Sequence, residues 1–175
     1  GRMSVPQGET AFLSSLTLTS GSTAHVMGGG LLQLLTALTN NGSLIVNPAG
    51  DLQITRLRAN SDTALTGTGS ITLNANPSNL DSALIESLKD ITLSQASTHS
   101  ITGQGRIYAQ MQNNGLIAAG SAGQFLEILG PVSQSVGGRI RAGAGTLTLR
   151  SGAAISGGEF SRTGAGRLTV DGTAS

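Results

Sequence analysis

The sequence predicts an all-β chain that folds as a parallel (right-handed) β-helix, a solenoid of about nine coils with a period near 19–21 residues. Apolar–x–apolar triplets recur along the whole chain, and nine of them begin between Leu16 and Leu168, at nearly even intervals that match this period. Each triplet has the pattern of a short strand with two side chains inward and one outward. The triplets are residues 16–18, 32–34, 52–54, 71–73, 91–93, 107–109, 126–128, 147–149 and 168–170. We therefore expect Leu52, Ile71 and Ile91 to stack in one inward column.

Two further observations favour coils over other β folds. A second apolar series precedes the triplets by six to nine residues: Val26, Ile45, Leu65, Ile85, Ile101, Ile117, Ile140 and Phe160. Corners rich in Gly and Asn, such as 40–42, 67–69, 113–115 and 137–138, precede the strands, and these residues adopt tight-corner backbone angles at low cost. An antiparallel sandwich or a β-prism, with the same residues at hairpins, is the alternative fold.

The domain organisation follows from the same spacing. Residues 1–15 are interpreted as an N-terminal cap or cloning remnant, and residues 16–175 as a single β-helix domain. Segment 78–90 has a Ser cap and Leu80, Leu84 and Leu88 at helical spacing, which predicts a short helix or helical turn in a corner. Because nothing amphipathic follows triplet 168–170, we expect an excised part of a longer rod whose open end self-associates end to end.

Composition and charge exclude several classes of protein. Ten Lys and Arg against nine Asp and Glu give a net charge of +1, which offers no general electrostatic reason to bind nucleic acid. The chain has no cysteine, so disulfide scaffolds, thiolate metal sites and thiol catalysis are excluded. No apolar run approaches the roughly 18 to 20 residues of a transmembrane helix.

The sequence contains no catalytic, cofactor-binding or metal-binding motif. His25 and His99 fit neither a metal-ligand pattern nor a nucleophile–base pattern. The corners carry Gly, Asn and Ser where a calcium-binding β-roll repeat needs Asp. A polysaccharide lyase or hydrolase needs carboxylates clustered on one wall, whereas the nine acidic residues are spread through this chain. We therefore expect no enzyme activity, no cofactor and no metal.

The middle residues of the triplets point outward, and from the second triplet onward they define a candidate binding face. These residues are Gln33, Gln53, Thr72, Thr92, Tyr108, Glu127, Thr148 and Thr169. Glu127 is the one carboxylate in this row, and no partner is expected for it in the neighbouring coils. Two arginine pairs, at 56/58 and 139/141, flank an inward aliphatic residue and are expected on different walls as solubilising charges.

Segments 113–120, 136–143 and 145–149 read Asn-Asn-Gly-Leu-Ile-Ala-Ala-Gly, Val-Gly-Gly-Arg-Ile-Arg-Ala-Gly and Gly-Thr-Leu-Thr-Leu. They resemble the filamentous haemagglutinin-type repeats of large secreted bacterial adhesins, most clearly over residues 101–173. The resemblance implies an exported parent protein, of the two-partner-secretion or autotransporter-like kind, at the bacterial cell surface. It implies a host-cell surface glycan or protein, or other cell-surface filaments, as partners.

The expected function is a non-enzymatic structural and adhesive segment of a secreted or surface-exposed bacterial filamentous adhesin. One alternative is a carbohydrate-active, polysaccharide lyase-like β-helix fragment. The other is a self-assembling structural filament.

Overall fold

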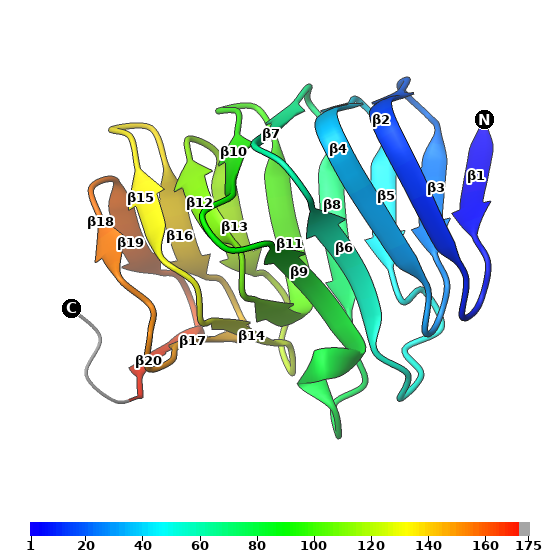
Figure 1. Cartoon of the computed structure of the whole chain (residues 1–175). Coiled ribbons are helices and arrows are strands. Elements are labelled where there is room, and N and C mark those ends of the chain that lie inside the picture. Colours follow the sequence, from blue (N-terminus) through cyan, green and yellow to red (C-terminus); the bar gives the residue numbers. More distant parts are fainter. Residues whose placement is uncertain (172–175) are drawn as a thin grey trace.

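The computed structural model describes residues 1–171 and consists of strands that run parallel to their neighbours in the coils on either side. The chain winds through three parallel sheets in a fixed order, and Figure 1 shows the resulting stack of coils from the N-terminal strand to the C-terminal strand. We call the sheets face 1, face 2 and face 3, in the order in which the chain passes through them. The predicted parallel β-helix is confirmed.

Each face is a ladder of strands in register. Face 1 contains β1 (Arg2–Val5), β3 (Thr23–Val26), β5 (Ser43–Val46), β8 (Ser70–Asn74), the start of β11 (Ser100–Ile107), β13 (Leu116–Ala119), β16 (Arg139–Ala142) and β19 (Glu159–Arg162). Face 2 contains the first halves of β2 (Thr10–Leu18) and β4 (Leu31–Asn40), then β6 (Thr55–Ala59), β9 (Ala83–Ser87), the end of β11, β14 (Phe125–Ile128), β17 (Thr146–Leu149) and β20 (Arg167–Val170). Face 3 contains the second halves of β2 and β4, then β7 (Thr63–Thr66), β10 (Thr92–Gln95), β12 (Gln110–Asn113), β15 (Val132–Gln134) and β18 (Ile155–Ser156).

The described residues form eight coils, one fewer than the sequence predicts, and the coils differ in length. Successive coils start at residues 2, 23, 43, 70, 100, 116, 139 and 159 on face 1. The coils that begin at Ser43 and Ser70 are longer than the predicted period, and the one that begins at Ser100 is shorter, so the regular spacing does not hold there. The first coil already includes β1 and β2, so residues 1–15 belong to the β-helix and are not a separate cap.

The core is a set of aliphatic columns that cross the coils. One column on face 1 runs through Met3, Ala24, Leu44, Ile71, Ile101, Ile117, Ile140 and Phe160. The predicted column of Leu52, Ile71 and Ile91 is wrong, because Ile71 lies between Leu44 and Ile101 while Leu52 is 60% exposed. In the last coils, where the period is regular, Leu126, Leu147 and Leu168 form one column, as the triplets predict.

The two long coils carry insertions that asparagine side chains connect. Asn74 Nδ2 donates to the carbonyl of Asn47 at 3.1 Å, Asn76 Nδ2 to that of Gly50 at 2.9 Å and Asn79 Nδ2 to that of Leu52 at 3.0 Å. The insertions therefore pack on one another and leave the strand ladders aligned. They project at one corner of the stack, where Figure 1 shows a short helical turn.

The short helix or helical turn predicted in segment 78–90 is present as a single turn. A 3-10 helix, η1 (Leu80–Ser82), is capped by the side chain of Asn79 and gives way at once to strand β9. Leu84 and Ile85 are buried as strand residues, and β9 pairs with β6 across five positions. Pairing with the neighbouring coil satisfies this backbone, so the local helical spacing does not decide the structure.

No helix among residues 1–171 is long and apolar enough to cross a membrane.

Candidate functional site

The eight residues of the predicted outward row do not form one face. Thr72 lies on face 1 in β8, Thr92 lies on face 3 in β10, and Gln53 lies in a loop before β6. Tyr108 follows β11 at the corner where face 2 ends. Gln33 lies on face 2 but in the second coil, where it is 8% exposed. Only Glu127, Thr148 and Thr169 stack in successive coils.

Face 2 instead carries an ion-pair ladder, which we define as Asp81, Arg106, Glu127, Arg150 and Asp171. Arg106 Nη1 lies 2.6 Å from Asp81 Oδ2, and Arg106 Nε lies 2.6 Å from Glu127 Oε2. Arg150 Nε donates to Glu127 Oε1 at 2.9 Å, and Arg150 also pairs with Asp171. These residues come from five successive coils, so charges of alternating sign connect the fourth coil to the eighth.

The interior residues of the ladder are surrounded by groups of opposite charge. Glu127 is 4% exposed, and each of its carboxylate oxygens accepts from an arginine. Burial by itself lowers the pKa of Arg106, but hydrogen bonds and charges from Asp81 and Glu127 outweigh it and raise that pKa above its usual value. Partial burial raises the pKa of Tyr108, and the hydrogen bond of 3.0 Å that its hydroxyl donates to Asp81 raises it further. With their pKa values raised, neither Arg106 nor Tyr108 is poised to exchange a proton near neutral pH.

The sequence does not reveal this ladder, and the expectation that Glu127 has no partner in the neighbouring coils is wrong. A signal was present, because one coil period separates Arg106 from Glu127 in the sequence, and the same interval separates Arg150 from Asp171. Opposite charges at the coil period stack directly on one another in a parallel ladder. To recognise the ladder, one must also know that the Arg106–Glu127 pair and the Arg150–Asp171 pair lie on the same face. Only the strand register shows this.

The two arginine pairs do lie on different walls. Arg56 and Arg58 flank the buried Leu57 on face 2 and both contact Glu86 of the next coil, with Arg58 Nε donating at 2.8 Å. Arg139 lies on face 1, 3.6 Å from Glu159, and both side chains are more than half exposed. The Glu86 contacts are therefore structural as well as solubilising.

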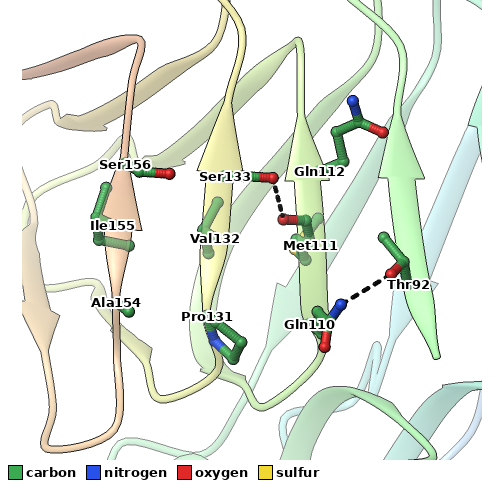
Figure 2. A pocket seen from close by; sticks show the side chains of 10 residues that line it. All are labelled: Thr92, Gln110, Met111, Gln112, Pro131, Val132, Ser133, Ala154, Ile155 and Ser156. Carbon is green, nitrogen blue, oxygen red and sulfur yellow. Dashed lines mark hydrogen bonds between the residues drawn. The ribbon is translucent and has the colours of Figure 1, made fainter. Parts of the chain in front are cut away.

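Face 3 differs from the other faces because none of its strand residues is charged. In the fourth to seventh coils this face has a groove of about 710 Å³, shown in Figure 2. The lining residues, which we call the face 3 groove, are Thr92, Gln110, Met111, Gln112, Pro131, Val132, Ser133, Ala154, Ile155 and Ser156. The hollow exists because Ser133, Ala154 and Ser156 are short, while Gln110 and Gln112 on β12 are long.

A buried polar cluster occupies the corner between face 3 and face 1. Asn40 Nδ2 lies 3.2 Å from His99 Nε2, and Gln95 Nε2 donates to the His99 carbonyl at 2.8 Å. His99 is 1% exposed, and burial lowers its pKa to about 4. His99 Nδ1 and Gln95 Oε1 have no hydrogen-bond partner within the described chain. Because Asn40, Gln95 and His99 are buried, this cluster offers no surface for a ligand.

Within residues 1–171, no group of three or more His, Asp or Glu side chains is placed to hold a metal ion. No family model, curated protein or solved structure matches this chain.

Proposed function

We propose that this chain is a non-enzymatic structural and adhesive segment of a secreted or surface-exposed bacterial filamentous adhesin. The observation that carries the proposal is that face 2 and face 3 differ in charge and in shape. Most charged residues on face 2 form ion pairs between coils, whereas face 3 has no charged strand residue and is hollowed over four coils. A rod built this way holds its shape and presents a binding surface along its length.

Repeated coils also support the mechanical part of the proposal. Each coil contacts mainly its two neighbours, through parallel strands on all three faces. Solenoids of this type extend by adding coils, because each new coil buries the apolar end of the last. The resemblance of segments 113–120 and 136–143 to adhesin repeats points to the same kind of parent protein.

A carbohydrate-active enzyme is the second candidate, and one observation favours it. Asp81 and Glu127 are brought to the same arginine beside Tyr108, which is a cluster of carboxylates with a basic residue on one wall. However, both oxygens of Asp81 and both oxygens of Glu127 already accept hydrogen bonds. A general acid or base needs a free position toward the substrate, so this geometry favours a structural role.

Saturable binding to cell surfaces tests the proposal. Fluorescently labelled protein is applied to cultured epithelial cells, and unlabelled protein competes for the bound fraction. We expect binding that saturates and is competed, with no release of unsaturated or reducing sugars from pectin, polygalacturonate or alginate. Sugar release that disappears in Glu127→Gln would replace the adhesin proposal with the enzyme. Absence of saturable binding to any cell surface tested would also contradict it.

A further inference from the structure

We propose that the face 3 groove binds a neutral, linear glycan that lies along the axis of the rod. The inference deepens the adhesive role proposed above and rests on it. It assigns the ligand class and the residues that contact the ligand.

The groove has the hydrogen-bonding groups that sugar hydroxyls need. Its outward side chains are hydroxyls and carboxamides from Thr92, Gln110, Gln112, Ser133 and Ser156. Each can both donate and accept, which matches a hydroxyl group better than it matches an anion or a cation. The side chains of Pro131 and Ala154 add apolar surface for the C–H face of a sugar ring.

Several of these groups are free to bind. Gln110 Nε2 donates to Thr92 Oγ1 at 2.9 Å, which fixes the orientation of one amide at the edge of the groove. Gln112 makes one long contact, as its Oε1 accepts from Ser94 Oγ at 3.4 Å. Within residues 1–171, the Gln112 amide nitrogen and the Ser156 hydroxyl make no hydrogen bond. Ser133 Oγ also makes one long contact, donating to the Met111 carbonyl at 3.4 Å. Figure 2 shows Gln112, Ser133 and Ser156 on three neighbouring strands, so these side chains follow one another across the coils.

The absence of positive charge from the groove argues against an anionic glycan. No Lys or Arg lines the groove, and no strand of face 3 contains one, so a sulfated or uronic acid polymer has no cation to pair with there. Four arginines of face 2, Arg56, Arg58, Arg106 and Arg150, are already paired with Asp or Glu in neighbouring coils. A neutral ligand therefore fits the face 3 groove best.

The length of the groove sets the size of the ligand. It crosses three steps between coils, about 14 Å at the usual strand spacing of about 4.8 Å. One sugar of an extended polymer advances by nearly one coil spacing, so we expect the groove to hold on the order of three to four sugars. Affinity then rises with chain length up to that size and levels off beyond it.

The test measures binding of neutral, uncharged β-linked hexose oligomers of graded length to the whole chain, beside heparin fragments and oligogalacturonates. Ser133→Arg places a large charged side chain in the centre of the groove and is expected to weaken binding by at least about tenfold. Gln112→Ala removes one amide and is expected to weaken binding about threefold to tenfold. Thr102→Arg, at an outward position on face 1, is the matched control and is expected to bind as the unmodified chain does.

Binding of the neutral oligomers is expected to change less than about twofold between about 50 mM and about 500 mM salt. Preference for heparin or oligogalacturonate with steep salt dependence would overturn the inference, as would equal binding by Ser133→Arg. A concentration-dependent dimer that Ser133→Arg abolishes, without glycan binding, would assign the groove to self-association and overturn it too. If cells still bind the protein while neutral oligomers do not, the ligand assignment fails and the adhesive role stands.

Discussion

His99 is the titratable residue whose environment differs most from water. It is packed beside Asn40 and Gln95, and neither of these side chains carries a charge. An amide that donates to His99 Nε2 leaves the ring proton on Nδ1, where no partner meets it. Protonating the ring would place a positive charge in this buried site, which explains the lowered pKa.

A pH-dependent loss of stability follows from that residue. The folded chain keeps His99 neutral down to about pH 4, whereas the unfolded chain binds the proton near pH 6.5. Stability is therefore full above pH 6.5 and falls as the pH drops toward 4, by about 3 kcal/mol. Urea unfolding of the unmodified chain and of His99→Gln across this range measures the difference. The partly exposed His25 supplies the control His25→Gln, and an equally steep acid loss in His99→Gln would contradict the assignment.

At the scale of the element, the corners depend on close contact between the backbones of neighbouring coils. A Cβ at Gly42 would lie 2.2 Å from the carbonyl oxygen of Ser22, and one at Gly69 would lie 2.3 Å from that of Gly42. These carbonyls accept the ladder hydrogen bonds from Ser43 and Ser70. Glycine is needed there because of this approach and not because of an unusual backbone angle.

Replacing Gly42 with Ala is therefore expected to cost on the order of 2 kcal/mol, since the backbone carbonyl must move. Gly120 is the matched control, because nothing lies within 4 Å of the position of its Cβ. Thermal unfolding should show a loss of about 4–8 °C in Tm for Gly42→Ala and no loss for Gly120→Ala. Equal Tm values for the two variants would mean that the coils are farther apart at this corner than the structure has them.

The sequence predicts elements well where coils are uniform and poorly where they are not. Leu126, Leu147 and Leu168 share a column, as the triplets predict, because no insertion interrupts their even spacing. Ile45, Leu65 and Ile85 belong to the second apolar series, yet they lie on three different faces. Insertions at residues 47–54 and 75–82 shift the register, and the triplet 52–54 mimics a strand inside one of them. Periodicity alone gives no sign of an insertion that happens to contain an apolar pair.

Sequence periodicity also fails to predict most residues of the candidate sites. Thr92 is the one residue of the predicted outward row that lines the face 3 groove, and the sequence predicts no binding role for the other groove residues. Gln112, Ser133 and Ser156 are ordinary polar residues in sequence, each separated from the next by about one coil period. They become a site only when three strands bring them side by side.

At the scale of the whole molecule, charge is distributed by face. Glu127 sits at the centre of the ion-pair ladder, 6% exposed at its side chain, between arginines whose side chains are 25% and 37% exposed. Removing its charge leaves both arginines with one partner each. The ladder therefore links the stability of five coils.

Glu127→Gln is expected to lower the free energy of unfolding by about 2 kcal/mol, less than a fully buried pair because the arginines keep some contact with water. Glu159→Gln is the control, since its pair with Arg139 spans 3.6 Å and is largely exposed. That control should stay within about 0.5 kcal/mol of the unmodified chain in urea unfolding. Losses of the same size in both variants would remove the distinction between the two ion pairs.

The most direct test of the fold, and of face 3 as one continuous surface, is a distance measurement along that face. Ser15, Ala64 and Ser156 occupy one outward column, with Ser15 in the first coil, Ala64 in the third and Ser156 in the seventh. The chain has no cysteine, so pairs of introduced cysteines carry spin labels at known positions only. Pulsed electron spin resonance should give about 29 Å for Ser15→Cys with Ser156→Cys and about 19 Å for Ala64→Cys with Ser156→Cys. Distances that do not grow with the number of coils between the labels would contradict the parallel stack and the continuous face built on it.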